Sequence, residues 1–332
     1  MGSVHLKLES LISTILDVVV IKTGLVISEG RLIQILNEEF PEDQTFQNYP
    51  ERKEFGLRLR SENFDKYCWK VRQKLGELEN DIRPYLVGDV DRAMEWYKKG
   101  YDPTKVMSRI IEVMGENYHP ENPHLIDPKP VLDKVIAENN APIELIREMF
   151  ESILAMQKVS NSISPVEQIL WDGGIDLIHF FEKELKPKKP TEFIEQKFIN
   201  YFEANPEKLE FMHWRNFERL TAEFFKREGY AVELGPGSND GGIDIRVYDK
   251  ENDEKPYIIV QCKRHKESNQ VKIETVKSFY TDVEFEEAKK GLIATTSRIA
   301  PGGKKVASIR KYPLEFAENQ KIKDWVNKMK KR

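Results

Sequence analysis

The sequence predicts an α+β protein of two domains, an all-α N-terminal domain followed by an α/β domain with a mixed central sheet flanked by helices. Three observations support this prediction. At 332 residues the chain exceeds the size at which one hydrophobic core usually keeps growing. Apolar residues recur at helical spacing up to about residue 185, and short apolar runs separated by turns follow. The composition, 39% hydrophobic and 33% charged, excludes a disordered or fibrous class.

The N-terminal domain is predicted from apolar residues three and four positions apart, which places them on one face of a helix. Examples are Leu32, Ile35 and Leu36; Val131, Leu132 and Val135; and Ile146, Met149, Phe150 and Ile153. Loops are predicted at 41–50, 101–103 and 117–130. The stretch 11–27 is interrupted by Asp17 and Lys22, so we expect a buried first helix and no membrane partner.

The domain boundary is predicted at the segment Lys186-Pro187-Lys188-Lys189-Pro190, because paired prolines and like charges resist a continuing helix. Residues 1–186 would form a helical domain for sensing or assembly. Residues 187–332 would form the second domain, with a linker helix at about 191–204.

The second domain is predicted to contain a helix over 214–224 and then alternating strands and helices. Strands are expected at 231–234, 243–247, 258–263, 291–296 and 314–316, and helices at 271–280, 304–309 and 322–329. This order predicts a mixed sheet covered by helices.

Polar residues interrupt two of these predicted strands. Alternation of side chains places Ile243, Ile245 and Val247 on one face and Asp244 on the other. Gln261 and Lys263 likewise share a face. If the two strands form a hairpin, Asp244, Gln261 and Lys263 converge above an apolar sheet, where polar groups without a partner are unfavourable.

This convergence is typical of metal-dependent phosphodiester hydrolysis, which needs an activated water and stabilisation of phosphoryl charge. Asp244, the side-chain oxygen of Gln261 and the backbone carbonyl of Cys262 are the predicted ligands of Mg²⁺, with Mn²⁺ as a possible substitute. Lys263 would position the water and counter the phosphate charge.

Several motifs in their order resemble the catalytic domain of Mrr-like (type IV) restriction endonucleases, which belong to the PD-(D/E)XK nuclease superfamily. The resemblance covers roughly residues 195–332. It rests on Phe217-Glu218-Arg219-Leu220, Gly229-Tyr230, Asp240-Gly241-Gly242-Ile243-Asp244, Gln261-Cys262-Lys263-Arg264 and 291–296. It implies an active site of Glu218, Asp244, Gln261 and Lys263, in which Gln261 replaces the acid of most members. It also implies Mg²⁺-dependent cleavage of double-stranded DNA in restriction or antiviral defence.

Basic segments follow the predicted site, although the net charge of the chain is -4. Lysines and arginines along a DNA backbone supply affinity that is independent of sequence. The predicted DNA-binding residues are Arg264, Thr295, Thr296, Arg298, Lys304 and Lys305. Ordinary solvated surface is the alternative interpretation for the charged residues, and strand-end packing is the alternative for the threonines.

A second copy of the five-residue motif, Asp172-Gly173-Gly174-Ile175-Asp176, serves as an internal control. Its flanks have helical spacing, and Glu184-Leu185-Lys186 lacks a strand that could direct it. We therefore predict that this copy is not a second active site.

The sequence thus predicts a Mg²⁺-dependent deoxyribonuclease that acts on double-stranded DNA. A junction-resolving or repair nuclease of the same fold and a catalytically idle DNA-binding or scaffold module are the alternatives. Cys68 and Cys262 are far apart in sequence, which favours a reducing compartment such as the cytoplasm. Cleavage of both strands favours a homo-oligomer, while the N-terminal domain matches no recognised family and leaves specificity open.

Overall fold

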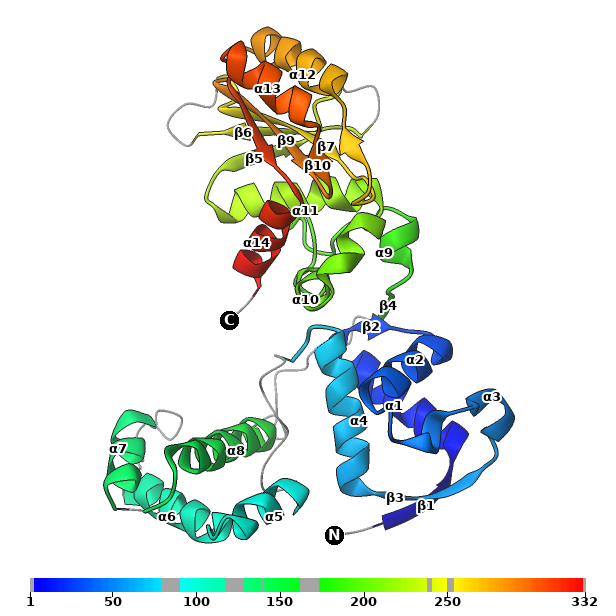
Figure 1. Cartoon of the computed structure of the whole chain (residues 1–332), viewed down its shortest axis with the longest axis vertical. Helices are drawn as coiled ribbons and strands as arrows, with labels where there is room; N and C mark the ends of the chain where they lie inside the picture. The colour runs from blue at the N-terminus through cyan, green and yellow to red at the C-terminus, as the bar shows by residue number, and fades with distance from the viewer. Residues whose placement is uncertain are drawn as a thin grey trace. The chain divides into compact units, whose positions relative to one another are not determined.

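The computed structural model describes residues 3–78, 90–116, 128–138, 140–161, 173–237, 241–249 and 254–330 (Figure 1). The chain forms two compact units that interleave in sequence. The first comprises Met1–Leu6, Gly56–Trp69 and Asn80–Asp172, and the second comprises Lys7–Phe55, Lys70–Glu79 and Gly173–Arg332. The domain boundary expected near residue 186 lies inside the second unit and stays a prediction.

The first unit contains a helical core built from the apolar spacing of its sequence. Its helices are α5 (Val90–Lys98), α6 (Pro103–Glu116), α7 (Pro128–Glu138) and α8 (Ile143–Asn161). Val106, Ile110, Val131 and Ile146 are among the buried residues that join α6, α7 and α8. The prediction of a helical N-terminal region is confirmed here.

Short strands add to the helices of the N-terminal region. β1 (Ser3–Lys7) pairs with β3 (Gly56–Arg60), and α4 (Ser61–Lys74) follows β3. In β3, Leu57 and Leu59 alternate with the exposed Arg58 and Arg60, and Leu59 is buried. Both strands alternate apolar and polar residues, a local strand pattern that the helical interpretation of this region missed.

The second unit begins with α1 (Leu8–Thr23), β2 (Leu25–Val26), α2 (Glu29–Glu39), the 3-10 helix η1 (Gln44–Phe46) and α3 (Tyr49–Arg52). Gly24 ends α1 in the left-handed region, with φ of 68°. Ser28 caps α2 by accepting a hydrogen bond from the N–H of Arg31 at 3.2 Å. β2 pairs in parallel with β4 (Ile175–Asp176), which leads into α9 (His179–Glu182).

A five-stranded mixed sheet forms the centre of the C-terminal part, in the order β11-β9-β7-β6-β5. The strands are β5 (Ala231–Leu234), β6 (Ile245–Tyr248), β7 (Ile258–Lys263), β9 (Lys290–Thr295) and β11 (Leu314–Ala317). β5, β6 and β7 are antiparallel neighbours, whereas β7, β9 and β11 run parallel. The predicted mixed sheet is confirmed, with the largely buried strand β7 in the middle.

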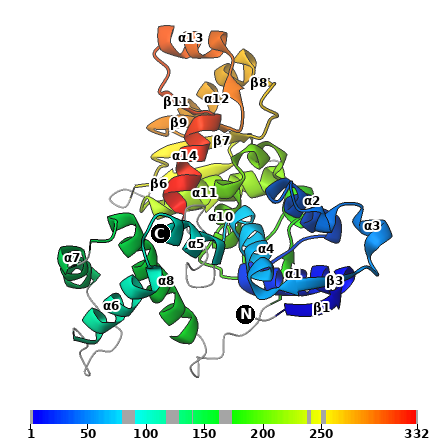
Figure 2. The same ribbon diagram turned by 60° about the horizontal axis from the view of Figure 1, so that its bottom comes forward.

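Helices cover both faces of this sheet (Figures 1 and 2). α12 (Ile273–Phe285) and α13 (Pro301–Ile309) lie on one face, where Phe279 packs with Ile259 and Ile293 of the sheet. α11 (Trp214–Arg227) and α14 (Asn319–Met329) lie on the other, joined by the stacked rings of Phe224 and Trp325. Two-residue strands β8 (Gln270–Val271) and β10 (Arg298–Ile299) pair outside the main sheet.

The lead-in to α11 is formed by α10 (Gln196–Ala204) and the 3-10 helix η2 (Pro206–Phe211). Asn205, between them, donates from Nδ2 to the carbonyl of Lys74 at 2.7 Å. Gly76 packs closely against the backbone of α10, since a Cβ there would lie 2.0 Å from the carbonyl oxygen of Asn200. The segment that precedes the five-stranded sheet therefore packs against Lys70–Glu79 and is hydrogen-bonded to it.

One detail of the expected strand pattern is wrong. β6 begins at Ile245, and Ile243 packs with Ile259 and Ile293 on the α12 side instead of sharing a face with Ile245 and Val247. The reason lies in Gly241 and Gly242, whose φ values of 65° and 90° turn the chain before the strand begins. Within the described residues, none of the helices combines the length and apolarity required for a membrane span.

Candidate active site at the end of the β6–β7 hairpin

The predicted hairpin brings Asp244 to the central strand. In the antiparallel register Ile245 lies opposite Val260, and Val247 lies opposite Ile258. Just before β6, the N–H of Asp244 donates to the carbonyl of Val260 at 3.0 Å. The Oδ2 of Asp244 accepts the N–H of Cys262 at 2.5 Å, so the carboxylate is held directly beside the Gln261–Lys263 segment.

Gln261 presents a buried oxygen in this position. Its Nε2 donates to the carbonyl of Gly242 at 2.9 Å, which fixes the orientation of the amide. Its Oε1 is buried and accepts no hydrogen bond from any residue that the structure describes. An unsatisfied buried acceptor costs roughly 1–3 kcal/mol, so this oxygen is a candidate ligand for a bound cation or water.

Gly242 makes this arrangement possible. Its φ of +90° is a conformation that other L-residues rarely adopt, and an added Cβ would lie 2.9 Å from Nε2 of Gln261. The close approach lets its carbonyl receive the amide of Gln261. The second glycine of the motif is thus required by its conformation and by the close approach of the Gln261 amide.

Glu218 is supplied by α11 and is almost fully buried, at 4% exposure. Nη1 of Arg215, one helical turn earlier, donates to its carboxylate at 2.6 Å. Nη2 of Arg215 donates to the carbonyl of Gly235 at 2.6 Å, which ties α11 to the loop after β5. Arg215 therefore fixes Glu218 with a charge-assisted hydrogen bond in a buried setting.

Glu223, the other buried acid of α11, has partners that join neighbouring segments. Its Oε2 accepts the N–H of Phe193 at 2.8 Å, and its Oε1 accepts Nε of Arg227 at 2.8 Å. These bonds join α11 to the lead-in segment before α10. Glu223 is thus engaged with the lead-in segment, and a role of Glu218 at the site stays a prediction.

Cys262 places its thiol toward α11, away from Gln261 and Lys263. Burial raises the pKa of this thiol well above its ordinary value, and the charges of Asp244 and Glu218 raise it further. A hydrogen bond with Thr221 acts in the opposite direction. Both carboxylates therefore act on one buried residue, which indicates that Asp244 and Glu218 converge from the hairpin and the helix.

Lys263 ends β7 and is partly exposed beyond the buried part of the strand. Its Cα partner on β9 is Thr295, whose hydroxyl donates to the carbonyl of Lys263 at 2.7 Å. Within the described part of the chain, Lys263 forms no ion pair. Its ammonium group is therefore available at the rim of the site.

The two predicted DNA-binding threonines are fully buried, at 0% exposure. The hydroxyl of Thr295 is engaged with Lys263, and that of Thr296 donates to the carbonyl of His265 at 2.7 Å. The N–H of His265 returns a bond to Thr296 at 2.9 Å. These contacts join the ends of β7 and β9, and a contact of either hydroxyl with DNA stays a prediction that this placement does not favour.

The predicted basic contacts lie at the surface. Arg264, Arg298 and Lys305 are exposed. Lys304 forms an ion pair with Glu318 at 2.6 Å, while the other oxygen of Glu318 accepts the N–H of Ile299. Their contact with DNA stays a prediction.

The oxygen donors near Asp244 fit a hard divalent cation. The described residues contain no group of three or more His, Cys, Asp or Glu side chains arranged to hold a metal. Gln261 and the carbonyl of Cys262 fall outside such a group, yet amide and backbone oxygens are ordinary ligands of Mg²⁺ and Ca²⁺. The buried Oε1 of Gln261, which accepts no hydrogen bond from the described residues, is the observation that supports this fit.

The sequence interpretation missed Arg215. It lies three residues before Glu218, and Arg–Glu at this spacing on a helix was a signal that could have found it. The missed information was tertiary, because only the folded chain shows that Arg215 is 8% exposed and reaches Gly235.

Comparison with known proteins agrees with this geometry. Residues 209–326 match the family Mrr_cat, described as restriction endonuclease. This segment is a restriction endonuclease-type nuclease domain. The match includes Glu218, Asp244, Gln261 and Lys263, and it begins within η2 and ends within α14.

Relatives outside the family comparison add less. A protein of Sinorhizobium fredii described as uncharacterized protein y4cE is 29% identical over 119 residues, which are 36% of this chain and 30% of that protein. The restriction endonuclease MspJI, solved in complex with a 27-mer oligonucleotide, gives a TM-score of 0.32 at 17% sequence identity. That match covers 57% of this chain and 41% of the MspJI chain. The restriction endonuclease FokI gives a TM-score of 0.31 at 11% sequence identity. That match covers 97% of this chain and 69% of the FokI chain. At these TM-scores neither structure bears on the arrangement of this chain.

Proposed function

We propose that the restriction endonuclease-type domain hydrolyses phosphodiester bonds of double-stranded DNA with a divalent cation, Mg²⁺ or Mn²⁺, and that the protein serves in restriction or antiviral defence. The observation that carries the metal dependence is the buried Oε1 of Gln261, which has no hydrogen-bond partner among the described residues, on the residue next to Cys262, whose N–H the Asp244 carboxylate accepts. An oxygen in that state suits a cation ligand better than a purely structural role.

Asp244, Gln261 and the carbonyl of Cys262 are the residues that would hold the cation. A bound divalent cation supplies charge stabilisation at phosphoryl oxygens and lowers the pKa of water. Lys263, at the rim, would orient the attacking water and counter phosphate charge. Glu218 would accept a hydrogen bond from that water, while Arg215 holds the Glu218 carboxylate in place.

DNA would be held by the cations at the surface of the domain. Arg264, Arg298, Lys304 and Lys305 would contact phosphates, which gives an affinity that falls steeply as salt rises. Cleavage of both strands calls for two active sites, so we propose a homo-oligomer. We place the protein in the cytoplasm, because the sequence contains only two cysteines, Cys68 and Cys262, which are far apart in sequence.

The test is a cleavage assay with the full chain on supercoiled plasmid, methylated plasmid and phage DNA. We expect linear or nicked products with Mg²⁺ or Mn²⁺, and none with EDTA. Cleavage that persists equally in EDTA would overturn the metal dependence. DNA binding without cleavage on every substrate would instead favour an idle DNA-binding module.

A parallel assay on branched DNA separates the defence role from the junction-resolving or repair alternative. A defence nuclease should cut linear methylated or phage DNA at least as well as a four-way junction of the same length. A marked preference for the junction would favour the junction-resolving or repair function. The proposed nuclease chemistry would be unaffected.

A further inference from the structure

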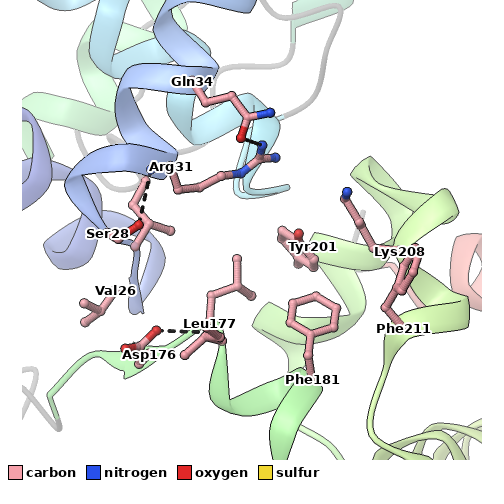
Figure 3. Close-up of a pocket in the computed structure, with 12 residues that line it drawn as sticks. Val26, Ser28, Arg31, Gln34, Asp176, Leu177, Phe181, Tyr201, Lys208 and Phe211 are labelled. Carbon is pink, nitrogen blue, oxygen red and sulfur yellow. Dashed lines mark hydrogen bonds between the residues drawn. The ribbon is translucent and has the colours of Figure 1, made fainter. Parts of the chain in front are cut away.

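A cavity of about 510 Å³ lies in the second unit, away from the nuclease site (Figure 3). Its walls come from the β2–α2 segment, from the β4–α9 segment and from the α10–η2 segment. The volume falls in the range of ligand pockets, about 300–1,000 Å³. None of the nuclease-site residues lines it.

Aromatic side chains from three elements line this cavity: Phe181 from α9, Tyr201 from α10 and Phe211 from the end of η2. Phe211 is 46% exposed, and Ile178 in the same wall is 52% exposed. Apolar groups that gather in a concave surface and stay exposed mark a binding site more often than isolated exposed ones do. The aromatic faces could stack on a planar ring.

Two cations face the same cavity. Figure 3 shows Arg31 of α2 and Lys208 of η2 approaching it from opposite sides, with Tyr201 and Phe181 between them. Arg31 donates to the neutral amide of Gln34 at 2.9 Å, and the Lys208 ammonium lies 5.9 Å from the centre of the Phe211 ring. In the described ranges of the chain, neither forms an ion pair. Two positive charges beside an apolar surface therefore favour an anionic ligand.

Two further polar groups line the cavity. Burial raises the pKa of Tyr201 to about 12, so its hydroxyl stays protonated at neutral pH and can donate to an anion. Asp176, the last residue of the repeated five-residue motif, is held by its Oδ1, which accepts the N–H of Ile178 at 3.1 Å. Its carboxylate offers an acceptor for an amino or hydroxyl hydrogen.

We propose that this cavity binds a free nucleotide, with the base between the aromatic side chains, the phosphates at Arg31 and Lys208, and a base amino or ribose hydroxyl group at Asp176. A nucleotide is the ligand class that combines a planar ring, negative charge and hydrogen-bond donors. Inorganic phosphate would leave the aromatic faces uncovered, and a neutral apolar ligand would leave both cations unpaired.

The experiment titrates the full chain, in EDTA, with the 5′-mono- and triphosphates of adenosine, guanosine, cytidine and uridine by isothermal titration calorimetry. EDTA removes the divalent cations that cleavage is proposed to need. The titration therefore measures binding alone and does not depend on the proposed nuclease activity. We expect at least one nucleotide to bind, and its triphosphate to bind more tightly than its monophosphate. Inorganic phosphate and a short single-stranded oligonucleotide serve as competing probes.

Two variants link the binding to the cavity. Phe211→Ala should weaken the affinity by about tenfold through lost stacking, and the double variant Arg31→Ala, Lys208→Ala should weaken it by roughly tenfold or more through lost charge-assisted bonds. Matched controls are Phe285→Ala, an 85% exposed phenylalanine at the end of α12, and Lys321→Ala, an exposed lysine of α14. Both controls should bind as the wild type does.

Thermal unfolding of each variant without nucleotide confirms that the fold is intact. The proposal is overturned if no free nucleotide binds at millimolar concentration, if the oligonucleotide alone binds, or if Phe211→Ala and Phe285→Ala have equal affinities. Phe211 and Phe285 are both strongly exposed, so substitution of either is compatible with folding.

Discussion

Residues 172–176 and 240–244 contain the same five letters, yet the structure gives the last aspartate of each copy different surroundings. Asp244 precedes the four-residue strand β6, and its Oδ2 accepts the N–H of Cys262, 18 positions away on the central strand. Asp176 lies in the two-residue strand β4, and its Oδ1 accepts the N–H of Ile178, two positions away. The first carboxylate joins distant segments, whereas the second organises a local turn.

The glycines of the two copies also differ in what requires them. At Gly242 a positive φ and the nearby amide of Gln261 exclude a side chain. At Gly174 an added Cβ would lie 2.4 Å and 2.6 Å from Cγ2 of Val20 and Val26, so close apolar packing is the reason. The same glycine is therefore required by a polar contact in one copy of the motif and by apolar packing in the other.

The residues downstream complete the contrast. Beyond the first copy, Glu184 belongs to an E-x-K pattern, but its carboxylate pairs with Arg219 and lies 3.6 Å from Nε of Arg215. These ion pairs lower the pKa of Glu184 against the opposing effect of burial, which acts to raise it. Glu184 thus supports the helix that carries Glu218 instead of forming a second metal site.

The largest expected effect is the loss of cleavage in Asp244→Ala. Removal of the carboxylate that we propose as a metal ligand should lower the rate of plasmid cleavage in Mg²⁺ by roughly 10³-fold or more. Asp324→Ala is the matched control, because Asp324 is an exposed aspartate of α14. If Asp244→Ala cuts plasmid at the wild-type rate, the distinction between the two copies of the motif loses its functional meaning.

The lysines that follow each copy should differ nearly as much. Lys263→Ala should reduce cleavage by about 10²–10³-fold, the effect of removing one preorganised donor from an active site. Lys186→Ala, the exposed lysine of the E-x-K pattern, should leave the rate within about twofold, since surface substitutions of this kind are close to neutral. Initial rates of plasmid nicking measure both, and equal rates for the two variants would contradict the assignment.

A smaller effect is expected from Arg215→Ala, which releases Glu218 without removing it. Positioning groups around metal sites typically change affinity or activity by about 10–100-fold. We expect the Mg²⁺ concentration for half-maximal cleavage to rise, a change that lost stability alone would not produce. Arg227→Ala is the control, because Arg227 pairs with Glu223 on the same helix, and it should alter the unfolding temperature but not the Mg²⁺ dependence.

The smallest effect is a shift in thermal unfolding. Mn²⁺ at about 100 times its Kd should stabilise the wild type by about 2.7 kcal/mol, or roughly 5–10 °C. Asp244→Ala should lose this shift, while Asp176→Ala should keep it. A Mn²⁺ shift that disappears in Asp176→Ala and persists in Asp244→Ala would reverse the roles of the two copies.

Much of the nuclease-type domain could be predicted from sequence, because its strands are short apolar runs of period two between clear turns. β5 was predicted at its observed bounds, and β7 likewise. Ile243 was misplaced, because alternation was continued through two glycines whose positive φ turns the chain. The local pattern holds only as far as the backbone stays extended.

The N-terminal region could be predicted less well. Its helices follow from apolar spacing, but β2 and β4, two residues each and about 150 positions apart, have no pattern of their own. Thr295 and Thr296 show the same limit at the site, since their hydroxyls are occupied by backbone carbonyls of residues about 30 positions earlier. Pairings of this kind arise from the packed chain and leave no periodic signal.

The sequence by itself determined that a helical region precedes a region with a mixed sheet, because helical spacing and strand alternation are local properties. It also determined the candidate residues Asp244, Gln261 and Lys263. Only the tertiary structure decided which Asp-Gly-Gly-Ile-Asp copy lies beside the central strand, that Oε1 of Gln261 is buried without a described partner, and that Arg215 holds Glu218. These are contacts between segments distant in sequence, and their burial and distance exist only once the chain has packed.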